Sequence, residues 1–156
     1  MFRAVVAAFT MLLLLASPGR AAEPDPQNWP TLLDAAKGQI VYFHAWGGEP
    51  RINAYIRWAG EQVSARYGVT PKQVKVDDTA NVVSQVLAEK ATGQTEDGAI
   101  DLVWINGENF AALKRQGLLL KNGWANKLPN WKYVDVSGKP TVASDFTVPT
   151  DGPEAP

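Results

Sequence analysis

The sequence predicts an α/β protein built on a doubly wound parallel sheet. Between residues 40 and 117, three strand-forming segments are each followed by a turn and a helix-forming segment. The first of these strands is almost continuously apolar, as expected where helices cover both faces of a parallel strand. Successive strand-then-helix units with right-handed crossovers give a layered open sheet. The 156 residues have room for one such core.

The first 21 residues predict a cleaved secretory signal. Arg3 precedes an apolar run, Pro18 and Gly19 end it, and cleavage is expected after Ala21, where small residues occupy both specificity positions. A membrane anchor is the weaker interpretation, because the apolar run is shorter than the ~20 residues of a spanning helix. We therefore expect a periplasmic protein that does not insert into the membrane after signal cleavage.

The first elements of the mature chain are a short helix and a strand. Residues 29–37 predict the helix, with Pro30 in its first turn and Gly38 after it. Residues 40–46 form the apolar strand, which Gly47-Gly48-Glu49-Pro50 ends. Residues 51–67 then predict an amphipathic helix closed by Gly68, with apolar side chains at helical spacing: Ile52, Ile56, Ala59 and Val63.

Two further units follow. Residues 73–76 predict a short strand, residues 77–79 a turn with capping side chains, and the apolar stripe of residues 82–87 a helix that ends near Gly93. Residues 100–105 predict the third strand, and a short helix led by Phe110 stops at Gly117. Beyond it the pattern becomes irregular, with one more strand expected within residues 141–148.

Composition excludes several functional classes. The chain has no cysteine, which rules out disulfides, thiolate metal sites and thiol catalysis. Its net charge is −1 and its basic residues are dispersed, so nucleic acid is not an expected partner. His44 is the single histidine, expected as a buried and hydrogen-bonded imidazole, so neither a histidine-rich metal set nor a Ser-His-Asp array is available. No glycine fingerprint for nucleotides occurs. We expect no enzyme activity, cofactor or metal.

The strand-to-helix junctions are the candidate binding residues. Ligands of open parallel sheets bind beyond the carboxyl ends of the strands, here at Trp46-Gly47-Gly48, at residues 77–79 and at Asn106-Gly107-Glu108. Glycines let backbone approach a ligand, and helix starts direct N–H groups at the same rim, where an anionic or polar group would dock. The alternative, that these residues only make turns, is equally supported for Gly47, Gly48 and Asn106 and is favoured for residues 77–79.

Two tryptophans lie near strand ends. Trp104 stands inside an apolar run, so core packing is favoured over stacking on a ligand. For Trp46, beside the glycines, core packing and stacking on a planar or cationic ligand are equally supported.

Three segments, 45–53, 101–110 and 145–152, resemble the extracellular solute-binding proteins of ABC importers, in the branch that includes thiamine-, iron- and polyamine-binding proteins. The resemblance implies a periplasmic-binding-protein-like (type II) fold, in which residues 22–148 form the first lobe and residues 149–156 begin a crossing to a second lobe that is missing. It places on the ligand-binding wall Trp46, Gly47, Gly48, Asn106, Gly107, Glu108, Thr147 and Asp151.

By the same resemblance, the expected function is solute binding for an import system. The implied partners are a small-molecule solute and the membrane permease of an ABC importer, and the protein is expected to be a monomer. Closure around a solute requires two walls, so a truncated single lobe is expected to bind weakly or not at all. The alternative is a stand-alone secreted α/β module with a structural or partner-binding role.

Overall fold

A computed structural model describes residues 24–94, 97–105, 107–120, 125–138, 144–145 and 147–150. The predicted signal segment, Asn106 and Asp151 lie outside these described residues, as does most of the predicted interlobe crossing. Among the described residues, no helix is both long enough and apolar enough to cross a membrane.

The chain has an α/β fold with a three-stranded parallel sheet. β1 (Ile40–Trp46) is the central strand, flanked by β2 (Thr70–Val76) and β3 (Leu102–Val103) in the order β2-β1-β3. β1 pairs with β2 along its whole length, from Ile40 opposite Thr70 to Trp46 opposite Val76. The carboxyl ends of β1 and β2 are therefore level with each other. The predicted parallel pairing is confirmed.

In the described part of the chain, four α-helices alternate with these strands: α1 (Trp29–Ala36), α2 (Pro50–Tyr67), α3 (Thr79–Ala91) and α4 (Gly107–Arg115). Two short 3-10 helices follow, η1 (Ala125–Lys127) and η2 (Pro129–Tyr133). Local chemistry sets the ends of the α-helices. Prolines occupy the first turns of α1 and α2, and α2 ends where Gly68 adopts a left-handed conformation at φ +70°. The four predicted helices are confirmed, with bounds shifted by a few residues.

The second strand is longer than predicted. β2 begins at Thr70, three residues before the expected start at Gln73, and includes Pro71. Proline cannot donate a ladder hydrogen bond, so it is confined to edge strands, strand starts or bulges. β2 is an edge strand of this sheet, and Pro71 is its second residue, so the proline does not interrupt the pairing with β1.

The third strand is shorter than predicted, because side-chain and loop contacts replace part of the expected ladder. Only Leu102 and Val103 form β3, opposite Phe43 and His44. One residue earlier, the Asp101 carboxylate accepts a hydrogen bond of 2.8 Å from the Tyr42 backbone N–H. One residue later, the Trp104 N–H donates to the His44 carbonyl at 2.9 Å. Residues 101–104 thus follow β1 closely, with two of them in strand conformation.

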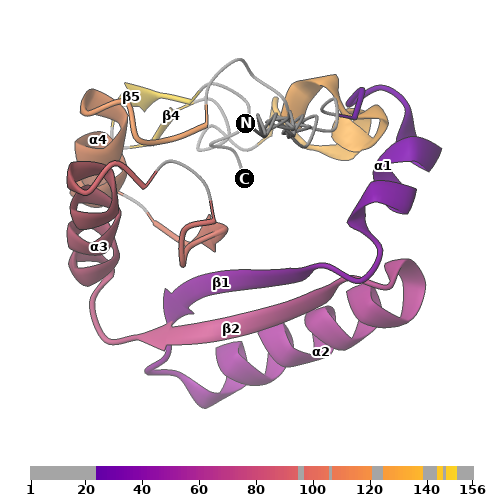
Figure 1. Ribbon diagram of the computed structural model, residues 1–156, viewed down its shortest axis with the longest axis horizontal. Coiled ribbons are helices and arrows are strands. Elements are labelled where there is room, and N and C mark those ends of the chain that lie inside the picture. Colours follow the sequence, from indigo (N-terminus) through magenta and orange to yellow (C-terminus); the bar gives the residue numbers. More distant parts are fainter. Residues whose placement is uncertain are drawn as a thin grey trace, which may run out of the picture.

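The strand expected within residues 141–148 is present but short, and it pairs with a second strand that was not predicted. β4 (Ser144–Asp145) and β5 (Val148–Pro149) pair antiparallel and form a separate two-stranded sheet. Thr147, between them, has φ +68°, which turns the chain back on itself. The hairpin lies beside α4 (Figure 1), and the Lys114 ammonium of α4 donates a hydrogen bond to the Pro149 carbonyl.

The helices are unevenly distributed over the sheet. α2 runs along one side, whereas α3 and α4 stand together near the carboxyl ends of β1 and β2 (Figure 1). Buried apolar side chains come mainly from α3 and α4, with one each from β1 and η1: Val82, Val83, Phe110, Ala111, Leu113, Ala45 and Ala125. Large side chains elsewhere on the sheet stay exposed, among them Tyr42, Trp46 and Leu102. The core is therefore concentrated at the carboxyl end of the strands.

Candidate functional site

The predicted binding residues lie at the carboxyl edge of the sheet. Because the strand order is β2-β1-β3, the chain passes from β1 to one neighbour and then crosses to the other. In doubly wound sheets, this order places the topological switch point between β1 and β3. Trp46, Gly47 and Gly48 follow β1, and Gly107 and Glu108 begin α4 after β3. Among the described residues, the two junctions share no hydrogen bond.

Gly47 is required by packing at the end of β1. Its N–H donates to the Val76 carbonyl at 3.0 Å, which extends the pairing with β2. Its carbonyl accepts a hydrogen bond of 2.8 Å from the Asn53 side-chain amide of α2. A Cβ at Gly47 would lie 2.7 Å from the Lys75 Cβ, so no other residue fits without movement of β2. The structure thus accounts for this glycine by its neighbours within the chain.

Gly48 makes room for the Trp46 side chain. A Cβ at Gly48 would lie 2.3 Å from the indole Cζ2 atom, so the ring lies across the glycine. Trp46 is 49% exposed, on the opposite face of the sheet from Phe43 and α2. Of the two interpretations left open for Trp46, core packing is therefore wrong. An aromatic face remains available to solvent at the rim.

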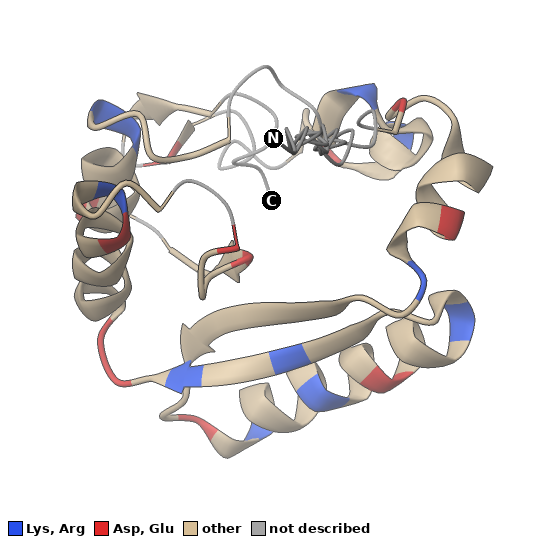
Figure 2. Ribbon diagram, in the orientation of Figure 1, with Lys and Arg blue, Asp and Glu red and all other residues tan. Residues whose placement is uncertain are grey.

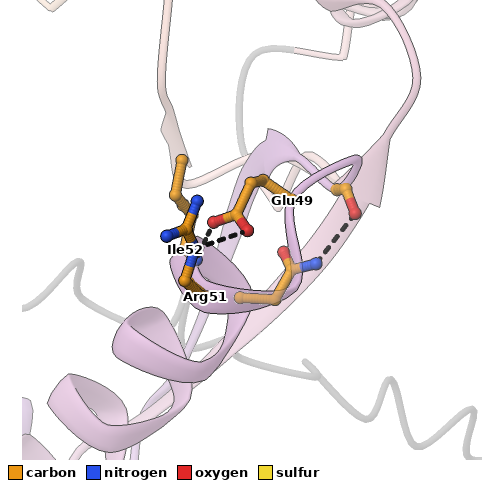
Figure 3. Close-up of polar contacts among 5 residues, drawn as sticks. Glu49, Arg51 and Ile52 are labelled. Carbon is orange, nitrogen blue, oxygen red and sulfur yellow. Dashed lines mark hydrogen bonds and ion pairs between the residues drawn. The ribbon is translucent and has the colours of Figure 1, made fainter.

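The start of α2 is occupied by a carboxylate of the chain itself. Glu49 is the N-cap, and its Oε2 atom accepts a hydrogen bond of 2.8 Å from the Ile52 backbone N–H, while Oε1 lies 3.1 Å from the Arg51 Nε atom (Figure 3). Hydrogen bonds from the backbone N–H groups of Arg51 and Ile52, together with the Arg51 side chain, hold the pKa of Glu49 below its ordinary value. Glu49 is therefore held in its ionised form.

The starts of α3 and α4 are capped in the same way. The Asp78 carboxylate accepts from the Ala80 N–H at 2.8 Å, and the Asp145 carboxylate accepts from the Gly107 N–H at 2.5 Å. Acidic residues accordingly mark the turns that lead into α2 and α3 (Figure 2). At each of these helix starts, a carboxylate of the chain therefore already accepts from one of the N–H groups that the prediction offered to an anion. The predicted capping role of the 77–79 turn is confirmed at Asp78.

The β4–β5 hairpin brings a distant segment to the same edge. Asp145 lies 38 residues after Gly107 in the chain, and its hydrogen bond attaches β4 to the first residue of α4. Thr147 is exposed in the turn of this hairpin. The structure therefore brings the hairpin that carries Thr147 to the α4 junction with Gly107 and Glu108. Asn106 and Asp151, the other two predicted residues of this group, lie outside the described residues.

Two predictions about single side chains are corrected. Trp104 is 50% exposed rather than part of the core, since α2 packs mainly against β2 and leaves the side of β3 uncovered. His44 is buried as predicted, at 5% exposure, but its Nδ1 atom has no hydrogen-bond partner among the described residues. The expected fully hydrogen-bonded imidazole is therefore wrong. Within the same residues, no three acidic, histidine or cysteine side chains group as a metal site would require.

Two grooves flank α2, away from the predicted residues. The more apolar groove has a volume of about 520 Å³ and lies between α2 and Trp104. The other has a volume of about 820 Å³ and includes polar residues of β2 such as Gln73 and Lys75. Both share Phe43 of β1, and neither includes Trp46, Gly47 or Gly48. These grooves lie on the α2 side of the sheet, whereas Trp46 lies on the other.

Sequence reasoning missed three residues that organise the rim: Glu49, Asn53 and Asp145. Glu49 was recognisable, because an acidic residue directly before Pro50 and an amphipathic run is a helix N-cap signal. Asn53 joins Gly47 to Gln73, whose side-chain amide donates to the Asn53 Oδ1 atom at 2.8 Å. No local pattern signals this contact or that of Asp145, because both depend on tertiary structure.

The chain is similar to Protein YnjB of Escherichia coli (strain K12). The two are 43% identical over 129 residues, which make up 83% of this chain and 32% of YnjB. The chain thus spans about a third of the length of this curated relative. No protein-family profile matches the chain, and no solved structure matches it significantly.

Proposed function

We propose that this chain is the first lobe of the solute-binding component of an ABC-type import system, with a periplasmic-binding-protein-like fold. The observation that carries the proposal is the switch point between β1 and β3. Open parallel sheets bind ligands at this position, and here it is flanked by the half-exposed Trp46 and by the start of α4 at Gly107 and Glu108. The solute would contact Trp46 and the backbone of the two junctions.

The charges at the rim favour a cationic solute over an anionic one. Carboxylates of Glu49, Asp78 and Asp145 each already accept from one of the helix-start N–H groups that could bind an anion. A like charge brought to this edge would be repelled, whereas a cation would be attracted. The exposed indole of Trp46 adds a surface on which a cation or a planar ring can stack. Thiamine or a polyamine fits this chemistry better than an oxyanion.

Further parts of the proposal concern the whole protein. The predicted signal would export the chain to the periplasm, and the permease of the importer would be its membrane partner. Hinge closure requires a second wall, and about two thirds of YnjB lies outside the match with this chain. We infer that this chain alone binds its solute weakly, because a single lobe contacts the solute from one side only.

A second candidate function is a stand-alone partner-binding module, which the exposed apolar side chains around α2 favour. Tyr55, Trp58 and Trp104 are each at least half exposed, and clustered exposed apolar residues mark interaction surfaces. In this case the protein would be secreted but would never capture a solute. The two candidates differ in whether the rim or the α2 side of the sheet makes the functional contact.

Titration of the labelled protein by NMR separates them. Thiamine, spermidine, ferric citrate and sulfate are added in turn, and amide shifts are followed at the β1 and α4 junctions. The proposal expects saturable shifts there with a cation, weakened by Trp46→Ala and unchanged by Trp58→Ala, which removes an exposed indole from α2. Rim amides that respond to none of the four ligands would favour the partner-binding module. Equal losses in both variants would contradict a specific contact of the solute with Trp46.

A further inference from the structure

The more apolar of the two grooves is open along one side of α2, and we call it the α2 groove. Its walls are large apolar side chains from three elements: Phe43 of β1, Trp104 after β3, and Ile52, Tyr55, Ile56 and Val63 of α2. Tyr55 and Trp104 are 65% and 50% exposed. Aromatic side chains of this size, gathered in a groove of about 520 Å³, are an interaction surface rather than scattered exposed residues.

The α2 groove lies over the part of the sheet that α2 leaves uncovered. Strands lie ~4.8 Å apart, and a helix with its side chains is ~10 Å across, so one helix covers about two strands. α2 packs mainly against the edge strand β2, which leaves the adjoining parts of β1 and β3 uncovered on that face. Parallel sheets normally have helices side by side over each face. The uncovered strip beside α2 is therefore where a second helix is expected.

The length and charge of the α2 groove define that helix further. The α2 residues that line it run from Arg51 to Val63, a length of roughly 18 Å at 1.5 Å per residue. Arg51 is the one charged residue among the lining residues that the structure describes, and its side chain is 93% exposed. The groove thus suits an amphipathic helix of about three turns, with an apolar stripe and a carboxylate near Arg51.

The comparison with YnjB indicates where such a helix comes from. The match covers 129 of the 156 residues, so it includes all of α2 and β3 whichever residue it starts from. About two thirds of YnjB lies outside the match. We propose that the α2 groove is the docking surface for an amphipathic helix from that remaining polypeptide. The docking is independent of solute binding, because the groove lies on the opposite face of the sheet from Trp46.

Mixing the purified chain with the longest contiguous stretch of YnjB outside the match tests the proposal. No solute is present, so the result does not depend on the proposed transport function. We expect a one-to-one complex in sedimentation velocity, with hydrogen exchange slowed at α2 and at Phe43 and Trp104. Absence of a complex would overturn the proposal. A dimer of this chain formed through the α2 groove, in place of that complex, would also overturn it.

Matched variants locate the contact. Tyr55→Lys and Trp104→Lys place charges in the α2 groove at exposed positions, so the fold should survive, which circular dichroism checks. Each is expected to weaken the complex at least tenfold. Tyr133→Lys is the control, because Tyr133 is 77% exposed on η2, outside the groove. Unchanged affinity in both groove variants, or an equal loss in Tyr133→Lys, would contradict docking at this surface.

Discussion

The indole of Trp46 lies across Gly48, two residues further along the chain. A Cβ at Gly48 would lie 2.3 Å from the indole Cζ2 and 2.6 Å from Cε2. Gly48 is not among the glycines with positive φ, so its backbone conformation does not itself require glycine. The residue is needed because any side chain would displace the ring. Gly48 therefore fixes where the exposed aromatic surface of the rim lies.

Gly48→Ala should rotate the Trp46 ring without unfolding the protein. The indole is held at the end of a side chain with two rotatable bonds, so it can move at a cost of about 1–3 kcal/mol. The expected result is a shift of the Trp46 indole N–H resonance and weaker shifts at the rim in the cation titration.

Gly60→Ala is the matched control for this change. Gly60 lies inside α2, where a Cβ would make only an ordinary contact of 3.6 Å with the Pro71 carbonyl. Alanine should stabilise the helix there by roughly 0.5–1 kcal/mol and leave the Trp46 resonance in place. A Trp46 resonance that stays unchanged in Gly48→Ala would contradict the packing of the ring on this glycine.

The Glu49 cap should make stability depend on pH in the acid range. Backbone N–H donors at Arg51 and Ile52 lower the pKa of Glu49 in the folded protein. The ionised cap therefore stabilises the fold fully above the unfolded pKa, and this contribution is lost as the pH falls through the folded pKa. Glu49→Gln should lower the urea midpoint at pH 7, with a difference from wild type that shrinks below about pH 4, near the ordinary pKa of glutamate.

Glu61→Gln provides the comparison for the Glu49 variant. Glu61 is an exposed carboxylate on the outer part of the same helix and does not cap it. Its variant should follow the wild-type dependence of the urea midpoint on pH. If Glu49→Gln and Glu61→Gln change the profile equally, the cap has no special role.

The parts of the fold set by local chemistry could be predicted, and the parts set by tertiary contacts could not. The apolar run of residues 40–46 gave β1 its bounds, and Pro50 and Gly68 marked the ends of α2. By contrast, residues 100–105 have the composition of a full strand, yet only two of them pair as a strand, and the Tyr42 N–H donates to the Asp101 side chain instead of to a backbone carbonyl. Strand propensity does not report which partner a backbone group finds.

The candidate site was predictable to a similar extent. Periodicity located the junctions after β1 and β3, since strand ends can be read from the sequence. The sequence could not show whether the N–H groups at these junctions are available to a ligand, because the cap of α4 comes from Asp145, 38 residues away. The exposure of Trp104 was missed for a related reason: an apolar run indicates burial, but burial depends on which helix covers the strand.

Asn53 should be a stability determinant of the β1–α2 junction. Its side chain donates to the Gly47 carbonyl and accepts from the Gln73 side chain, both at 2.8 Å and partly buried. Asn53→Ala would leave both partners without these bonds, at an expected cost of about 1–3 kcal/mol in the free energy of unfolding. Urea denaturation measures this cost. Asn81→Ala is the control, because Asn81 is exposed on α3, and it should change the free energy of unfolding by less than about 0.5 kcal/mol. Similar losses of stability in both variants would contradict the bridging role of Asn53.

Asp145 should hold the β4–β5 hairpin against α4. Its carboxylate accepts from the Gly107 N–H, so Asp145→Ala removes both a cap and a negative charge at the helix start, at an expected cost of about 1–2 kcal/mol.

Asp145→Asn keeps an oxygen acceptor and should lose less stability than Asp145→Ala. Asp34→Ala, which removes an exposed ion pair with Lys37 on α1, should lose well under ~1 kcal/mol. Hydrogen exchange gives the decisive measurement, because release of the hairpin should speed exchange at Gly107 and at the β5 residue Val148 in Asp145→Ala alone. If exchange at Val148 stays at the wild-type rate while Gly107 is released, the Lys114 contact with Pro149 holds the hairpin without Asp145.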